Sequence, residues 1–278
     1  MSKIIGIDVG GSTTKIVGYD QEQLFSPLLV KANDPVSSIY GAFGRFLNEN
    51  KLQLNEIDRI MITGVGATFI EENIFDIPTY KVGEFLAIGM GGLFLSRLKR
   101  AIIVSMGTGT AYVMADNDKA YHIGGTGVGG GTLLGLSNRM LNVRNFNDIV
   151  DMAKGGDLSH IDLSIADISH DNVGGLTSET TASNFGKIID RATKADVALG
   201  IINLVFQTIG MMAVFASRNE KVNDVVLTGN LTNVPQAKTI FEGLTSLFGV
   251  IFHIPEYAEY ATAVGAAMVP PGNMITEV

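Results

Sequence analysis

The chain has 278 residues, 46% hydrophobic and 17% charged, which is typical of a compact globular protein and argues against disorder. Its 28 acidic and 20 basic residues give a net charge of −8, which disfavours nonspecific nucleic-acid binding. The absence of cysteine excludes disulfides, cysteine nucleophiles, cysteine-ligated zinc and cysteine-held iron–sulfur clusters. No signal-peptide pattern opens the chain, and no window approaches the roughly 18 uninterrupted apolar residues of a membrane span. We therefore expect a soluble cytoplasmic protein without nucleic-acid or membrane partners.

The first predicted element is a buried strand at residues 4–8, joined by a glycine turn to a returning strand at residues 15–20. The sequence of this hairpin, IIGIDVGGSTTK, puts Asp8 at the end of the strand and Lys15 after the turn. Backbone amides at glycines approach phosphate oxygens closely, lysine adds a positive charge, and a carboxylate suits Mg²⁺. The alternative is an ordinary polar hairpin in which the glycines satisfy only the geometry of the turn.

Apolar residues at helical spacing then predict a helix at residues 35–52. A strand is predicted at 59–63 and a second helix at 82–98. Glu84 lies at the start of that second helix. One interpretation is a first-turn acid favoured by the helix dipole, and the other is a general base that takes a proton from an attacking hydroxyl.

The opening pattern recurs as a strand at residues 100–105, a glycine-threonine turn at 106–110 and a strand at 111–115. Two such units indicate a duplicated fold. Residues 119–135 are predicted to form a dense glycine loop that passes into a helix at 133–141. The loop contains GxGxGG but lacks the strand and acid context of a dinucleotide site, and no Walker-type loop is present.

The rest of the chain alternates helices and strands, which indicates an α/β layered architecture. The polar stretch at residues 157–183 is predicted to leave the fold at its rim and border an acceptor pocket. We also expect the two halves to meet through residues 124–131. The remaining predicted elements are a short helix at 147–155, a long apolar helix at 194–218, a strand at 224–228 ending at Gly229-Asn230, a helix at 235–247, a strand at 250–254 and a helix at 262–268.

Four of these motifs together resemble the sugar-kinase, heat-shock-70 and actin superfamily, in which two duplicated ribonuclease-H-like domains clamp ATP. They are IIGIDVGGSTTK, VSMGTGT, the strand end TGN and the late AVGAA. Within it, GTGVGGGT, MAKGGD and ASNFG are similar to type II (eukaryotic-like) pantothenate kinases, in order and at compatible spacings. The resemblance implies two such domains at residues 1–100 and 101–278, with ATP and Mg²⁺ in the cleft between them. It also implies a homodimer built through the helix at 194–218.

The resemblance further implies phosphorylation of the primary hydroxyl of pantothenate to 4'-phosphopantothenate, the first step of coenzyme A biosynthesis. Asp8 would hold the metal and Glu84 would be the catalytic base. Thr108, Thr110 and His122 would contact pantothenate along with Glu84. The residues implied to contact ATP are Gly10, Gly11, Ser12, Thr13, Lys15, Gly107, Thr108, Gly109, Gly129, Gly130, Gly131, Thr132, Gly229 and Asn230.

One position departs from the family pattern. Members usually have an arginine before the glycine loop on the pantothenate side, whereas this chain has Tyr121-His122. A histidine does not reproduce a bidentate arginine–anion contact, and the alternative interpretation of His122 is a packed or solvated residue without a role. The alternatives are therefore another small-molecule kinase of the superfamily, acting on pantetheine or an amino sugar, or a noncatalytic nucleotide-binding protein. The dehydratase activators, whose first strand is similar, hold an iron–sulfur cluster through cysteines and are excluded by the composition.

Overall fold

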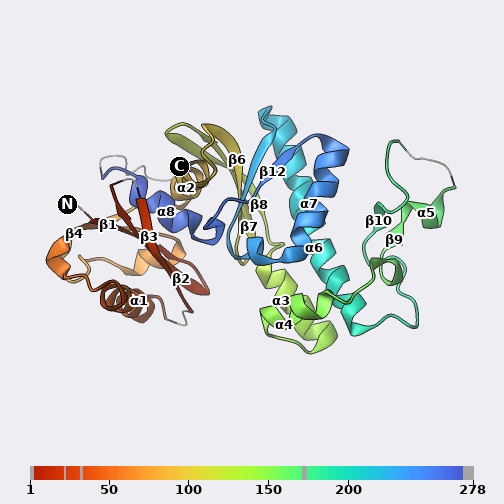
Figure 1. Ribbon diagram of the computed structural model, residues 1–278, viewed down its shortest axis with the longest axis horizontal. Helices are drawn as coiled ribbons and strands as arrows, with labels where there is room; N and C mark the ends of the chain where they lie inside the picture. The colour runs from red at the N-terminus through yellow and green to blue at the C-terminus, as the bar shows by residue number, and fades with distance from the viewer. Residues whose placement is uncertain (1–2, 22, 32–33, 171–173, 272–278) are drawn as a thin grey trace.

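The computed structural model describes residues 3–21, 23–31, 34–170 and 174–271 (Figure 1). Two five-stranded sheets lie side by side along the long axis, each covered by helices on both faces. The first sheet has the order β3-β2-β1-β4-β5 and the second β12-β11-β6-β7-β8. Each sheet contains a three-stranded antiparallel meander extended by two parallel strands. This repeated order confirms the predicted duplicated α/β architecture.

The first sheet is covered on one face by α1 and on the other by α8 (Ala261–Met268), and its side chains alternate between these two faces. Ile5, Ile7 and Val9 pack on the face covered by α1, while Gly6 and Asp8 point to the opposite face because side chains alternate along a strand. The elements of this half are β1 (Lys3–Val9), β2 (Thr13–Asp20), β3 (Gln23–Lys31), α1 (Pro35–Asn50), β4 (Ile57–Thr63), β5 (Thr79–Lys81) and the 3-10 helices η1 (Leu54–Glu56) and η2 (Val65–Phe69).

The second sheet repeats this arrangement with longer helical additions. Its central helix, α6, packs with α3, α4 and α7 over β6, β7 and β11, and together they form the largest apolar core. The elements are β6 (Arg100–Met106), β7 (Thr110–Asp116), β8 (Lys119–Thr126), α3 (Gly130–Leu141), α4 (Phe146–Ala153), α6 (Lys194–Glu220), β11 (Asp224–Thr228), η4 (Asn230–Asn233), α7 (Pro235–Phe248), β12 (Ile251–His253) and η5 (Ala258–Tyr260).

Helix α6 is long and apolar enough by composition to cross a membrane, with a mean hydropathy of 2.0 over its most apolar window. In this fold 61% of that window is buried inside the protein. A capping box at Thr193 and Asp196 starts the helix, and Lys221 ends it with a left-handed backbone conformation, φ 53°. The helix is therefore explained as the core helix of the second half.

The two halves are joined by helices that cross between them, α2 (Glu84–Ser96) and α8 (Ala261–Met268). Helix α2 leaves the first sheet to pack on β6, β7 and β8, whereas α8, at the end of the chain, returns to β1, β2 and β4 (Figure 1). The helices touch closely: a Cβ on Gly91 would lie 1.8 Å from the Ala261 carbonyl oxygen. The expectation that the halves meet through residues 124–131 is wrong in this respect, because the α2–α8 pair provides the main connection.

Two local predictions are also wrong. Residues 119–126 form strand β8 rather than a loop, and α3 starts at Gly130 rather than at Leu133. Strands β3 and β5, which sit at the edges of the first sheet, were not predicted. Glycines lower strand propensity, but in β8 the pairing with β7 decides the structure.

The excursion at residues 157–183 contains η3 (Leu158–His160), α5 (Ile165–Ile168) and the two short strands β9 (Leu163–Ser164) and β10 (Thr181–Ser183). It lies beyond α6, at the end of the molecule opposite the first sheet (Figure 1). The excursion thus lies away from the first half of its own chain, and its place beside an acceptor pocket stays a prediction.

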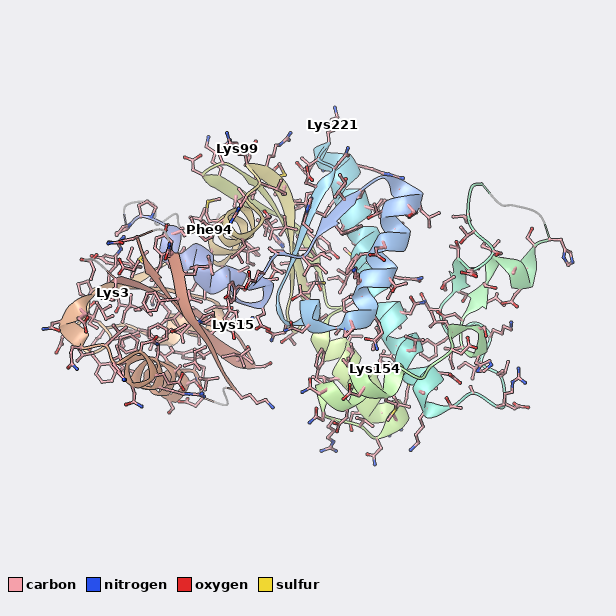
Figure 2. The ribbon with its side chains drawn as sticks, in the orientation of Figure 1. Lys3, Lys15, Phe94, Lys99, Lys154 and Lys221 are labelled. Carbon is pink, nitrogen blue, oxygen red and sulfur yellow. The ribbon has the colours of Figure 1, made fainter. Side chains whose placement is uncertain are left out.

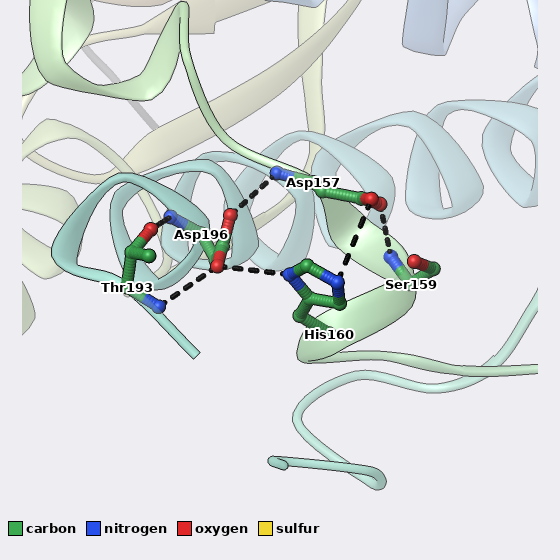
Figure 3. Close-up of polar contacts among 5 residues, drawn as sticks. All are labelled: Asp157, Ser159, His160, Thr193 and Asp196. Carbon is green, nitrogen blue, oxygen red and sulfur yellow. Dashed lines mark hydrogen bonds and ion pairs between the residues drawn. The ribbon is translucent and has the colours of Figure 1, made fainter. Parts of the chain in front are cut away.

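Two buried carboxylates attach this excursion to α6. The Asp196 carboxylate accepts hydrogen bonds from the Asp157 amide at 2.7 Å and the Thr193 amide at 2.8 Å, and His160 Nδ1 lies 3.1 Å from it (Figure 3). The Thr193 amide contributes most to holding the pKa of Asp196 well below its usual range, against the opposing effect of burial. Asp162 accepts from Asn203 Nδ2 at 2.7 Å in the same way.

Candidate functional site

The first hairpin carries a buried ion pair. Asp8 on β1 lies opposite Lys15 on β2, and Lys15 Nζ is 3.9 Å from Asp8 Oδ2. Both side chains are largely buried, and Figure 2 shows Lys15 on the side of the first half that faces the second. Burial raises the pKa of Asp8, and the positive charge of Lys15 opposes that rise. A carboxylate and an ammonium are thus held together at the end of the sheet that faces the cleft.

Gly64, directly after β4, makes room for the Asp8 carboxylate. Its φ of +88° is a conformation that residues with a side chain rarely adopt, and a Cβ at this position would lie 2.7 Å from Asp8 Oδ1 and 2.6 Å from the Val9 carbonyl oxygen. The sequence analysis assigned Gly64 no role. The signal was present, because Thr-Gly follows the central parallel strand in both halves, at Thr63-Gly64 and at Thr228-Gly229.

The tips of the two glycine turns meet across the cleft. Ser12 Oγ of the first turn lies 3.5 Å from Thr108 Oγ1 of the second, although the residues are 96 positions apart. Each turn is closed by an amide of its first glycine, with the Gly10 amide donating to Thr13 O at 3.0 Å and the Gly107 amide to Gly109 O, one residue nearer in the chain, at 2.9 Å. Gly11, Ser12, Gly107 and Thr108 are exposed. The structure therefore brings together the two turns that the sequence singled out.

The second turn rests on the start of α3. The amides of Gly130 and Gly131 donate to the carbonyl oxygens of Gly107 and Thr108, at 2.9 and 2.8 Å. A Cβ on Gly129 would lie 2.7 Å from Thr108 O, so close packing requires glycine there. Thr132 Oγ1 donates to Gly127 O at 2.9 Å. In this conformation these four residues support the turn, and the amides of Gly130 and Gly131 are already engaged.

Gly229 and Asn230 follow β11 beside the second turn. Gly229 has φ +91°, and a Cβ there would lie 2.4 Å from Met106 O. Among the described residues, Asn230 Oδ1 is buried without a hydrogen-bond partner. An unpaired buried carbonyl oxygen in a native fold calls for a partner that arrives with a ligand.

The N-terminal end of α2 carries Glu84, and His122 of β8 packs against the residue that follows it. Glu84 is the first residue of the helix and is half-buried. The next residue, Phe85, stacks on the His122 ring with centroids 4.1 Å apart and planes at 15°. Tyr121 is directed elsewhere, because its hydroxyl donates to Glu220 at 2.6 Å. Thr110 is buried and its hydroxyl donates to Val128 O at 2.9 Å, so that hydroxyl has a structural partner here.

The two halves can be compared position by position because their sheets have the same register. Asp8 lies opposite Lys15 and beside Thr63, while the matching Ser105 lies opposite Ala111 and beside Thr228. The duplication therefore repeats the backbone but not the chemistry. Only the first half has a charged pair at this position.

Two surface cavities lie away from this cleft. One, of about 540 Å³, lies between η4, α7 and β12, and the other, of about 520 Å³, lies between α2, the β7–β8 turn and the end of α8. None of the predicted site residues lines either of them. The site is therefore identified from the meeting turns and the Asp8–Lys15 pair.

A family model described as Fumble matches residues 100–245, more than half of the chain. The chain belongs to the Fumble family. It is 29% identical over 273 residues to proteins named type II pantothenate kinase from Staphylococcus aureus strains USA300 and bovine RF122, with 94% of this chain and 97% of each relative covered. These findings confirm the resemblance that the motifs predicted.

Solved structures share the fold of this Fumble-family chain. Component A of (R)-2-hydroxyglutaryl-CoA dehydratase from Acidaminococcus fermentans matches with a TM-score of 0.67 and 19% identity, over 96% of both chains. A ROK family glucokinase from Streptomyces griseus, in complex with glucose and AMPPNP, matches with a TM-score of 0.62 and 12% identity, over 96% of this chain and 98% of that one. At these identities the likeness establishes the actin-like ATPase fold and leaves the substrate open.

Proposed function

We propose that this chain is a type II pantothenate kinase, which transfers the γ-phosphoryl group of ATP to the primary hydroxyl of pantothenate. Membership of the Fumble family and the Staphylococcus aureus relatives support this assignment. The observation that carries it is the meeting of the two turns, with Ser12 and Thr108 3.5 Å apart in front of the Asp8–Lys15 pair. The exposed hydroxyls of Ser12 and Thr108, one from each half, and the exposed backbone of Gly11 offer the donors that a polyphosphate needs.

The ATP side of the site is formed by the two turns and Lys15. Gly10 to Thr13 and Gly107 to Gly109 surround the phosphates in this proposal, and the Lys15 ammonium neutralises part of their charge. Gly130 and Gly131 hold the second turn in position through hydrogen bonds to Gly107 and Thr108, Gly129 packs against the same turn, and Thr132 is hydrogen-bonded to Gly127. Gly229 and Asn230 contact the adenosine, and the unpaired Asn230 Oδ1 supports this role.

Mg²⁺ fits the chemistry of this site. No group of three or more histidine, cysteine, aspartate or glutamate side chains suited to a metal occurs among the residues that the structure describes, so a cage made only of protein carboxylates is not expected there. Mg²⁺ commonly binds through one or two carboxylates together with phosphate oxygens, and Asp8 supplies one such carboxylate. When bound, the ion would offset the negative charge of the phosphates.

The acceptor side of the site is formed around the start of α2. Glu84 receives the proton of the pantothenate hydroxyl as that hydroxyl attacks phosphorus. Its place at the helix N-terminus stabilises the carboxylate form before the transfer. His122, fixed by its stack on Phe85, and the second turn at Thr108 and Thr110 contact the rest of the acceptor. Closure of the halves about α2 and α8 excludes water and protects ATP from hydrolysis.

The same proposal includes a cytoplasmic homodimer. Helix α6 is the candidate interface, because the large apolar side chain of Phe215 is 59% exposed on it. Exposed aromatic side chains are enriched at subunit contacts. The proposed domain division at Arg100–Ala101 falls directly after the first residue of β6.

The experiment that tests the function measures ATP consumption with pantothenate, pantetheine, N-acetylglucosamine or no acceptor. Pantothenate is expected to give turnover well above the blank. Turnover with the amino sugar alone would support a different kinase of the superfamily. ATP binding without turnover on any acceptor would support the noncatalytic alternative, for which the replacement of the family arginine at Tyr121-His122 is the motivating feature.

A further inference from the structure

The inward face of the first sheet carries a row of three polar side chains at its carboxyl edge: Lys15, Asp8 and Thr63. Lys15 and Thr63 flank Asp8 in register on β2 and β4. Two positions away from them along these flanking strands, Val17 packs with α8 and Met61 packs between α8 and α2. Because side chains alternate along a strand, Lys15 and Thr63 lie on this same face. The row therefore faces the cleft.

The Thr63 hydroxyl at the end of this row is one of three buried hydroxyls without a hydrogen-bond partner in the described residues, the others being those of Thr14 and Ser137. It alone lies beside the Asp8 carboxylate in strand register. Thr63 is completely buried, and its Oγ1 has no hydrogen-bond partner among the described residues. A buried hydroxyl without a partner destabilises the folded chain, and native proteins rarely retain one without a reason. Valine has the same shape and would fill the position without that cost, so packing alone does not explain the threonine.

The other half of the molecule provides an internal reference. Thr228 occupies the matching position on β11, and its hydroxyl donates to Val104 O at 3.3 Å. Thr228 lies beside Ser105, whereas Thr63 lies beside the Asp8 carboxylate. The hydroxyl is thus paired with the backbone where the neighbour is neutral, and it lacks such a bond where the neighbour is the carboxylate.

The position of Lys15 indicates when Thr63 gains a partner. In the structure the Lys15 ammonium lies 3.9 Å from Asp8 Oδ2 and forms an ion pair with it. A bound polyphosphate attracts the same ammonium, and Asp8 then needs another donor to keep its orientation. The adjacent strand offers one, the Thr63 hydroxyl.

We propose that Thr63 is a positioning residue: its hydroxyl donates to the Asp8 carboxylate in the nucleotide-bound enzyme and orients that carboxylate toward the metal-bearing phosphates. This inference rests on the proposed ATP- and Mg²⁺-binding role of the cleft and does not depend on the identity of the acceptor. The unpaired hydroxyl in the ligand-free chain is the cost of holding this donor ready.

The test compares the full-length wild type with Thr63→Val, Thr63→Ser and the matched variant Thr228→Val. The thermal midpoint of each is measured alone and with a non-hydrolysable ATP analogue while Mg²⁺ is titrated. Thr63→Val is expected to be at least as stable as wild type without ligand but to need about tenfold more Mg²⁺ for the same nucleotide stabilisation. Thr63→Ser should respond to Mg²⁺ like wild type.

Thr228→Val should show the opposite pattern, with a lower midpoint in the absence of ligand and a Mg²⁺ response within about twofold of wild type, because its hydroxyl has a backbone partner. The inference is wrong if Thr63→Val responds to Mg²⁺ like wild type, if it loses ligand-free stability as Thr228→Val does, or if Thr63→Ser fails to restore the response. A wild type that shows the Mg²⁺-dependent stabilisation but no turnover of pantothenate refutes the proposed acceptor and leaves the Thr63 inference intact.

Discussion

Replacing Gly64 with alanine tests whether the backbone after β4 is shaped to admit the Asp8 carboxylate. The native φ and ψ are 88° and 166°, a region that is almost exclusive to glycine. The added Cβ would also lie 2.6 Å from Val9 O and 2.7 Å from Asp8 Oδ1, closer than real Cβ atoms approach their neighbours. Neither the backbone nor the buried carboxylate can move away without disturbing the paired strands β1 and β4.

The expected loss of stability follows from these two effects. The backbone conformation costs about 1–3 kcal/mol with a side chain present, and relief of the contacts adds an amount of about the same size. We expect a total of about 3 kcal/mol, which corresponds to a fall in thermal midpoint of about 6–12 °C for a chain of this size. The displaced Asp8 carboxylate should also weaken the Mg²⁺-dependent stabilisation by an ATP analogue.

Differential scanning fluorimetry with and without Mg²⁺ and the analogue measures both effects. Gly229→Ala is the matched strain control for the midpoint without ligand only, since its φ is +91° and its Cβ would meet Met106 O at 2.4 Å, while its place on the proposed adenosine side excludes it as a control for the ligand response. Gly44→Ala in α1, where a Cβ meets nothing within 4 Å, should be neutral or stabilising. A Gly64→Ala midpoint within 1 °C or so of wild type would refute the argument from backbone conformation. A large fall in midpoint with an unchanged Mg²⁺ response would refute the argument that Gly64 positions Asp8.

Four further outcomes are expected. Glu84→Gln should leave ATP-analogue binding nearly unchanged and lower turnover by about 10²-fold or more, whereas an equal loss of both would mean that Glu84 is structural. His122→Arg should lower the KM for pantothenate, with little change for the uncharged pantetheine, if His122 faces the acceptor carboxylate. Phe215→Asp should shift a dimer toward monomer in sedimentation while circular dichroism is retained, because this side chain is mostly exposed on α6. The pKa of Asp196 is lowered in the folded chain, so its contribution to stability is complete above the ordinary aspartate pKa and is lost as the pH falls below that value toward the lowered pKa. Limited proteolysis should therefore detach residues 157–183 at strongly acidic pH sooner than it cuts the sheets, and Asp196→Asn should remove this pH dependence.

Elements with local signals were predictable from the sequence. Helix α1 has proline at its first position and an aspartate cap, Asp34, whose carboxylate accepts from the Ser37 amide at 2.7 Å. The hairpin β1–β2 is predicted by an apolar run that is followed by a glycine turn and a second strand pattern. The pairing of two such hairpins was inferred from their similarity, and the Ser12–Thr108 contact now shows the two turns facing each other.

Features that depend on tertiary contacts were not predictable in this way. Helix α2 packs on the second sheet and α8 packs on the first. The sequence gives no local signal for these placements beyond glycines such as Gly91, which allow the two helices to approach each other. Strand β8 contains two adjacent glycines, and only its partner β7 makes it a strand. Asp162 and Asp196 are ordinary acids in the sequence, and their role in attaching the excursion to α6 follows from a fold that brings donors to them from distant positions.

The duplication gives this fold an unusual advantage for finding functional residues. A residue that the backbone requires should appear in both halves, and Gly64 and Gly229 do so, with φ of 88° and 91°. A residue that serves chemistry should appear in one half only. Asp8 and Lys15 meet this criterion, since Ser105 and Ala111 replace them in the second sheet. Thr63 meets a subtler form of it: the same residue type occurs in both halves, but only the copy beside the carboxylate keeps its hydroxyl free of a backbone bond. The internal comparison therefore separates the requirements of the fold from those of the site within a single sequence.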